Sequence, residues 1–239
     1  MAAVALVTPC YAEILRPSDR VHARRVLEEL GDFVHEIRGR CCGQPGFNSG
    51  NQREAAQAGK ELLRAAHEFD TVVTPSGSCT SMVRHALPEL FAGRLRDGAG
   101  RISARFVEFS AYVSGHQQVE QLSLNLDATV AYHDSCHARR DLGLTDSVFS
   151  LLARIDGLEV RRLEMEAVCC GFGGAFSVKH AEVSEAIRTL KLDDVAGTGA
   201  QILVSTDLSC LSHVATGARS AGLALETWTI AELLAEALE

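Results

Sequence analysis

The chain has 239 residues, of which 46% are hydrophobic and only 5% aromatic, so we expect a substantial core built from Ala, Val and Leu. Its 31 acidic side chains outnumber the 23 basic ones and give a net charge of −8, which argues against nucleic-acid binding because phosphate contacts need concentrated Lys and Arg. No apolar run is long enough to span a bilayer, and the apolar N-terminus reaches Pro9 and Cys10 without the basic residues of a signal peptide, so we expect a cytoplasmic protein.

The first half of the chain alternates predicted strands with predicted helices. The runs "AVALVTP" before Cys10 and "DTVVTPSGS" before Cys79 are short and rich in β-branched residues, which indicates buried strands followed by turns. Between them we expect one helix from an N-cap at Ser18 to a stop at Gly31, and a longer amphipathic helix over 51–69. The apolar side of the shorter helix is expected to carry Val21, Leu27 and Leu30.

The second half repeats this alternation after a segment, 115–127, that is polar and without clear periodicity at its start. The strand runs "ATVAYHDS" and "AQILVSTDLS" precede Cys136 and Cys210, and helices are expected over 177–197 and 229–239. Such alternation favours parallel sheets with right-handed crossovers. We therefore predict an α/β protein of two pseudo-repeated, Rossmann-like halves, with boundaries at residues 1–118 and 119–239.

Eight cysteines occur in the same order and with nearly the same spacing in the two halves. Each half has a single cysteine, then an adjacent pair followed by glycine, then another single cysteine. The offsets between equivalent positions (136 − 10 = 126, 169 − 41 = 128, 210 − 79 = 131) agree closely, which indicates a duplicated domain. Because the single cysteines follow predicted strands, we expect them past the carboxyl ends of those strands, where open α/β sheets bind ligands. The first set is Cys10, Cys41, Cys42 and Cys79, and the second is Cys136, Cys169, Cys170 and Cys210.

The adjacent cysteines favour metal chemistry over disulfides. Neighbouring Cα atoms lie about 3.8 Å apart, less than the roughly 4.4–6.8 Å that a disulfide prefers. Clustered cysteines in a reducing cytosol also favour metal or redox sites. Four cysteines per half is the usual ligand number of a [4Fe–4S] cluster, so one or two such clusters per chain are expected. Zinc is the alternative at one site, although structural zinc sites usually draw on CxxC pairs, which this sequence lacks.

Other side chains lie close to these cysteines in the sequence. The position of His213, three residues after the last cysteine, would allow it to ligate a metal. The plainer interpretation, which also covers His133 and His137 beside Cys136, is an outer polar group near the site. Met82 is interpreted as core packing at the start of a helix. The sequence holds no P-loop and no GxSxG or GxGxxG motif, so we assign no catalytic residue.

Five blocks of the sequence resemble the cysteine-rich CCG-domain family, which includes the cysteine-rich subunit of heterodisulfide reductase and the iron–sulfur subunit of glycolate oxidase. They extend over nearly the whole chain: "TPCY" (8–11), "CCGQPGFNSG" (41–50), "PSGSC" (75–79), "CCGFGGAFSVKHAEVSEA" (169–186) and "STDLSC" (205–210). The resemblance implies that each set of four cysteines holds one cluster. It also implies an electron-transfer subunit of a cytoplasmic system that oxidises lactate to pyruvate. The partners would be a second iron–sulfur protein and a small third subunit.

One departure from the family motif bears on the function. The motif ends in CxxC, but Met82 and His213 stand where the last cysteine of each half would be. The missing fifth thiol favours a four-thiolate cluster, or a mixed site that includes His213, over the five-thiolate noncubane cluster of heterodisulfide reductase. It also counts against one rival function, a thiol–disulfide reductase subunit. The other rival, a structural zinc protein, predicts a colourless and redox-silent chain.

Overall fold

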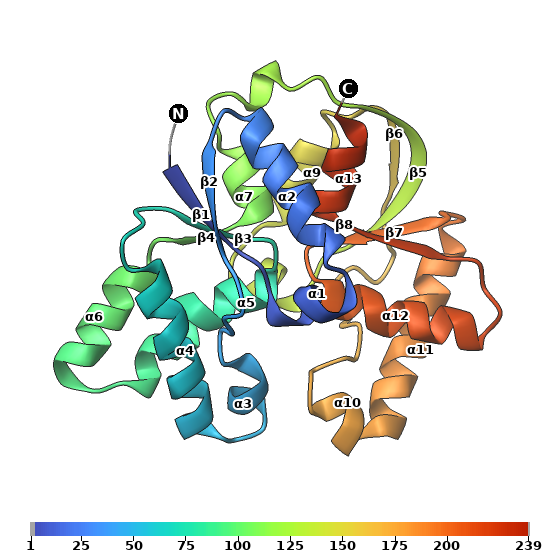
Figure 1. Cartoon of the computed structure of the whole chain (residues 1–239). Coiled ribbons are helices and arrows are strands. Elements are labelled where there is room, and N and C mark those ends of the chain that lie inside the picture. Colours follow the sequence, from blue (N-terminus) through green and yellow to red (C-terminus); the bar gives the residue numbers. More distant parts are fainter. Residues whose placement is uncertain (1–2, 239) are drawn as a thin grey trace.

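The computed structural model describes residues 3–238 and contains two four-stranded sheets, each wholly parallel (Figure 1). The strand orders are β2-β1-β3-β4 and β6-β5-β7-β8, so the two sheets have the same topology. In each sheet, the two central strands are the first and third of that half. The predicted fold class, two pseudo-repeated α/β halves with parallel sheets, is confirmed.

The first sheet is built from the N-terminal half of the chain. Its strands are β1 (Ala3–Val7), β2 (Phe33–Ile37), β3 (Val72–Thr74) and β4 (Phe106–Glu108). The helices of this half are α1 (Cys10–Leu15), α2 (Ser18–Glu29), α3 (Gln44–Asn48), α4 (Gln52–Ala66), α5 (Gly77–Ser81), η1 (Met82–Ala86), η2 (Leu87–Leu90), α6 (Gly93–Ser103) and α7 (Phe109–Ser114).

The second sheet repeats this plan in the C-terminal half, after the short helix η3 (Val119–Gln121). Its strands are β5 (Asn125–His133), β6 (Asp156–Arg161), β7 (Ile202–Ser205) and β8 (Glu226–Thr229). Its helices are α8 (Cys136–Arg140), α9 (Thr145–Leu152), α10 (Phe176–Lys179), α11 (Ala181–Gly197), α12 (Leu208–Ser220) and α13 (Ile230–Ala237).

Each central strand is apolar on both faces because helices cover both sides of the sheet. In β1, Val4 and Leu6 belong to a core that also contains residues of the second half, whereas Ala5 and Val7 belong to a separate core on the outer side. Successive side chains of a strand point to opposite faces, so a strand buried on both sides has no polar alternation. Three cores result: one shared between the halves and one on the outer face of each sheet.

Helices from both halves meet in the shared core. Figure 1 shows α2, in blue, beside α13, in red, and the two helices pack against each other between the sheets. Polar contacts join the start of α2 and the residue after α1 to β8 and α13. The Thr229 hydroxyl donates to Asp19 at 2.5 Å, and Arg16 donates to the Thr227 carbonyl at 2.6 Å and to Glu232 at 2.8 Å. The halves are therefore bound together by a common apolar core and by buried and half-buried polar contacts.

The structure corrects three details of the predicted helices. Ser18 is the first residue of α2 rather than its cap, because Pro17 occupies the N-cap position and no side chain caps the helix. Val21 is 55% exposed, because the buried side of α2 and its C-cap is formed by other residues at helical spacing: Ala23, Val26, Leu27 and Leu30. The helix predicted over 177–197 is interrupted at His180, whose φ of −132° and ψ of 52° are not helical.

The C-terminal helix predicted over 229–239 is present as α13, and the hydroxyl of its N-cap Thr229 accepts a hydrogen bond from the Glu232 amide. Glu239 lies outside the described residues. Among residues 3–238, no helix combines the length and apolar character that crossing a bilayer requires.

Candidate metal centre

The single cysteines lie where the sequence places them, just beyond the carboxyl ends of the central strands. Cys10 begins α1 after β1, and Cys79 lies in α5 after β3. Cys136 begins α8 after β5, and Cys210 lies in the first turn of α12 after β7. Because parallel strands bring their carboxyl ends to one edge, each sheet gathers two thiols from segments far apart in the sequence.

The paired cysteines come from the loops after the edge strands β2 and β6, and each pair ends at a glycine with a left-handed backbone. Gly43 has a φ of 88° and Gly171 a φ of 87°, a region that L side chains rarely adopt. A Cβ at Gly43 would lie 2.4 Å from the Ala55 carbonyl oxygen, and one at Gly171 would lie 2.6 Å from the Ser184 carbonyl oxygen. Only glycine therefore lets each pair pack closely against the long helix that follows, α4 or α11.

The first set of cysteines is gathered at one point. The Sγ atoms of Cys10 and Cys41 lie 3.5 Å apart, and those of Cys42 and Cys79 also lie 3.5 Å apart. The Gly43 amide donates to the Cys41 sulfur at 3.4 Å. These separations exceed the length of a disulfide, about 2.05 Å, and all four thiols are free.

The second set shows the same arrangement with a closer pair. The Sγ atoms of Cys170 and Cys210 lie 2.9 Å apart, and the Gly171 amide donates to the Cys169 sulfur at 3.4 Å. Cys136 contacts the His137 ring, with 3.5 Å between its Sγ and Nδ1. The structure therefore brings together the four predicted cysteines of each half, with the same amide-to-sulfur hydrogen bond in both.

Hydrogen bonds between the thiols favour one thiolate in each set. Bonds from Cys10 and Cys42 hold the pKa of Cys41 well below its usual value, and the same bond together with burial raises the pKa of Cys10. In the second half, the pKa of Cys169 is lowered and that of Cys136 raised for the same reasons. The thiolate is the form that binds metals, so each set contains one cysteine, Cys41 or Cys169, whose surroundings favour the metal-binding form.

The donor chemistry of both sets fits a metal or an iron–sulfur cluster. Each set offers four sulfur atoms at the end of a rigid sheet, and soft thiolate ligands select zinc, Cu(I) or iron–sulfur clusters. The Gly43 and Gly171 amides that point at sulfur are the kind of outer hydrogen bond that adjusts the reduction potential of a cluster.

Both sets open into the same cavity. Seven of the eight cysteines, all except Cys41, line a space of about 360 Å³ between the halves, together with Gln44, Asn48 and Phe172. The two sets therefore share one entrance and face each other across it.

The cavity also contains a buried carboxylate that sequence reasoning missed. Asp207 precedes α12 and is 2% exposed. Its Oδ1 accepts hydrogen bonds from the Ser76 hydroxyl at 2.7 Å and from the amide and hydroxyl of Ser78 at 3.0 and 2.7 Å. Its Oδ2 accepts one from the Ser135 hydroxyl at 2.5 Å. In the repeat, Asp207 is equivalent to Ser76, so this bond joins matching positions of the two halves.

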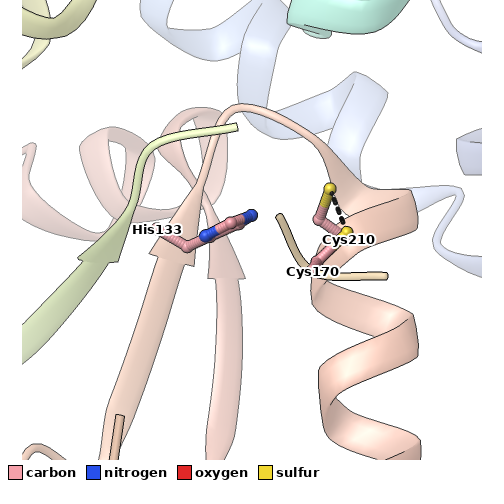
Figure 2. Close-up of side chains that lie close together, drawn as sticks. All are labelled: His133, Cys170 and Cys210. Atoms are coloured by element: carbon pink, nitrogen blue, oxygen red, sulfur yellow. Dashed lines mark hydrogen bonds between the residues drawn. The ribbon is translucent and has the colours of Figure 1, made fainter. Parts of the chain in front are cut away.

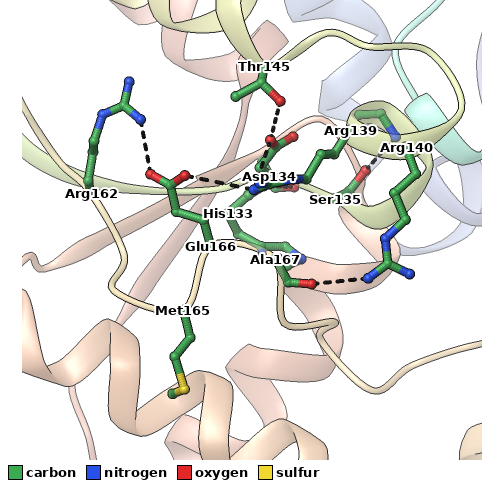
Figure 3. Close-up of polar contacts among 12 residues, drawn as sticks. His133, Asp134, Ser135, Arg139, Arg140, Thr145, Arg162, Met165, Glu166 and Ala167 are labelled. Atoms are coloured by element: carbon green, nitrogen blue, oxygen red, sulfur yellow. Dashed lines mark hydrogen bonds and ion pairs between the residues drawn. The ribbon is translucent and has the colours of Figure 1, made fainter.

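Polar contacts hold the loop that carries the second cysteine pair. Figure 3 shows Arg139 of α8 between two carboxylates, with its Nη1 3.9 Å from Asp134 and 3.7 Å from Glu166. The neighbouring Arg140 donates to the Ala167 carbonyl at 3.3 Å. These contacts tie the segment just before Cys169 to the helix that begins with Cys136.

The three histidines near the cysteines have different surroundings. His213 is half-buried, and its Nε2 lies 3.2 Å from the Ser184 hydroxyl. His133 is 1% exposed, and its ring points toward Cys170 and Cys210 (Figure 2). Burial, with a further contribution from Lys191, lowers the pKa of His133 to about 4. The third histidine, His137, contacts Cys136 as described above. Met82 is buried against the first set, as predicted.

A fold of two like halves, each gathering cysteines at its strand ends, is that of a duplicated cysteine-rich domain. The model of the family described as "Cysteine-rich domain", CCG, matches residues 4–84 and 130–215, which include all eight cysteines. The chain belongs to this CCG family.

Its relatives include proteins that match it from end to end. Lactate utilization protein A of Halalkalibacterium halodurans is 33% identical over 234 residues, which cover 97% of this chain and 96% of that protein. Lactate utilization protein A 1 of Bacillus anthracis is 31% identical over 238 residues, 98% of each chain.

A solved structure supports the fold at low sequence identity. A hypothetical protein from Helicobacter pylori superimposes with a TM-score of 0.62 and 12% identity over 99% of this chain. The chain spans 50% of the length of that protein.

Proposed function

We propose that the protein is an iron–sulfur electron carrier in a system that oxidises L-lactate to pyruvate in the cytoplasm. The observation that carries the proposal is the gathering of four free thiols at the strand ends of each half, with both sets facing one cavity. The names of the full-length relatives support the link to lactate. The proposed ligands are Cys10, Cys41, Cys42 and Cys79 in the first half, and Cys136, Cys169, Cys170 and Cys210 in the second.

The residues of the chain would position the clusters, and the clusters, most simply [4Fe–4S], would supply one-electron chemistry. The sheets fix the single cysteines, and the glycine turns fix the pairs. The Gly43 and Gly171 amides donate to sulfur, which stabilises negative charge on the ligands. We propose a second iron–sulfur protein and a small third subunit as partners. In this proposal one of these partners, and not this chain, binds lactate.

Growth of the source organism on lactate tests this role. A strain that lacks the protein is expected to fail on L-lactate as sole carbon source and to grow normally on pyruvate, which enters after the oxidation. The wild-type chain should restore growth on lactate, whereas Cys42→Ser and Cys170→Ser, which remove equivalent ligands of the two sets, should not. Undiminished growth on lactate without the protein would contradict the proposal.

A further inference from the structure

His133 is a buried histidine with unsatisfied hydrogen-bonding groups. It ends β5, is 1% exposed, and within residues 3–238 neither of its ring nitrogens has a hydrogen-bond partner. Buried polar groups are nearly always paired, and an unpaired one needs an explanation such as a bound ion. Nearby Lys191 does not provide a partner, because its ammonium donates to the Met165 carbonyl at 2.7 Å and contacts Asp194 at 3.3 Å.

The His133 ring lies beside two thiols of the second set. A ring nitrogen and the sulfurs of Cys170 and Cys210 all lie within 4.8 Å of one another, and Figure 2 shows the ring directed toward them. All three residues are buried. Imidazole nitrogen and thiolate sulfur are common ligands of zinc and of iron in proteins, so this trio has the donors of a metal site.

The repeat supplies an internal comparison. His133 stands three residues before Cys136, and the residue three before Cys10 is Val7. Val7 lies against the first set, since it lines a small space together with Cys10, Cys42 and Cys79. The same position therefore faces the cysteines in both halves, but it carries an apolar side chain in the first and an imidazole in the second.

We propose that His133 is a nitrogen ligand of the metal centre in the second half, where it joins Cys170 and Cys210. His133 then takes the place of either Cys136 or Cys169 among the four ligands named above, because a [4Fe–4S] cluster has four ligand positions. The two halves hold chemically different centres, with thiolates alone in the first and three thiolates plus an imidazole in the second. This inference rests on the metal binding assumed in the proposed function, but it moves the histidine of the second site from His213 to His133. An imidazole ligand in place of a thiolate raises the reduction potential of an iron–sulfur cluster.

Electron paramagnetic resonance of the reduced protein, prepared without oxygen, tests the ligand directly. The wild-type spectrum should show coupling to a directly bonded ¹⁴N nucleus that changes on labelling with ¹⁵N-histidine. The coupling should be lost in His133→Ala and kept in His213→Ala, which removes the imidazole bonded to Ser184. Coupling that persists in His133→Ala, or that is absent from iron-loaded wild-type protein, would overturn the proposal.

A second variant keeps the test decisive if His133→Ala fails to fold. His133→Cys retains a ligand at the position, so it should hold its iron, lose the nitrogen coupling and titrate at a lower potential than the wild type. An unchanged potential and spectrum would count against ligation. If the wild-type protein holds zinc instead of iron, the proposed function fails, and zinc X-ray absorption with and without His133 still decides the ligand.

Discussion

At the scale of single residues, the two glycines after the cysteine pairs are the least replaceable positions of the sites. Gly43→Ala and Gly171→Ala should each destabilise the protein by more than the roughly 1–2 kcal/mol that a left-handed residue costs, because the new Cβ meets backbone at 2.4 and 2.6 Å. Both variants should also lose metal from their own half. Denaturant unfolding and metal analysis measure these effects.

Gly39 offers a matched control for the glycine variants. It has a φ of 64°, but a Cβ there would meet nothing within 4 Å. Gly39→Ala should therefore cost only the roughly 1–2 kcal/mol of a left-handed residue and leave the metal content unchanged. If Gly43→Ala and Gly171→Ala lost no more stability than this control, the close packing of the two glycine turns would not contribute to the stability of the protein.

The sequence predicts the cysteines of the site better than their surroundings. The positions of the thiols follow from strand patterns and from a repeat, both visible along the chain. Asp207 was missed, and His133 was assigned only an outer role, because the importance of both depends on burial and on contacts between distant segments. The repeat held a signal for His133, since a histidine replaces the Val7 of the first half at an equivalent position.

At the scale of elements, Asp207 joins the start of α12 to α5 and to the residue before α8. Asp207→Ala should leave several buried donors unpaired and destabilise the protein by about 3 kcal/mol or more. Ser78→Ala, which removes only one hydroxyl donor, should cost about 1 kcal/mol. Unfolding free energies of the two variants check the order, and equal effects would show that the carboxylate does not bind the halves together.

The contact between α2 and α13 predicts a specific dependence on pH. Burial raises the pKa of Asp19 from 3.8 to about 6, only partly offset by the bond from Thr229 and by the charge of Arg16. The folded state therefore holds a proton that the unfolded state releases, and the stability due to Asp19 falls as pH rises from about 4 to 6. A pKa difference of about two corresponds to about 3 kcal/mol.

Asp19→Asn should remove this dependence. The stability of the variant relative to the wild type should increase by about 2 kcal/mol between pH 4 and pH 6, most of the full difference of about 3 kcal/mol. Asp97→Asn, which removes one carboxyl group at an exposed position of α6, is the control for the change in net charge. Free energies of unfolding measured against pH at matched metal content test this prediction. If Asp19→Asn and the wild type showed the same pH dependence, burial would not raise the pKa of Asp19 at this interface.

The elements that sequence patterns locate are those with clear periodicity. The runs before the single cysteines indicate β1, β3, β5 and β7, the central strands, because strands buried on both faces are continuously apolar. The helix start at Ser18 and the exposed Val21 were predicted wrongly, since local signals there compete with tertiary packing. The packing of α2 on α13 links residues more than two hundred positions apart, which no local pattern reveals.

At the scale of the whole molecule, the duplication brings two sites to one place. The shared core fixes the sheets relative to each other, and their carboxyl edges meet at one cavity lined by both cysteine sets. Two cofactors bound at these facing sites would suit the proposed carrier, because electrons could pass between them. The equivalence is incomplete, since Val7 and His133 differ, and the two centres are expected to differ in potential.

The most direct test of this account is the iron, sulfide and zinc content of protein purified without oxygen, with its absorption spectrum. We expect about four irons and four sulfides per half, with broad absorbance that bleaches on reduction. Cys42→Ser and Cys170→Ser should each lose about half of the iron and sulfide, since each removes a ligand from one set. Near-stoichiometric zinc without sulfide, in a colourless protein, would contradict an iron–sulfur carrier.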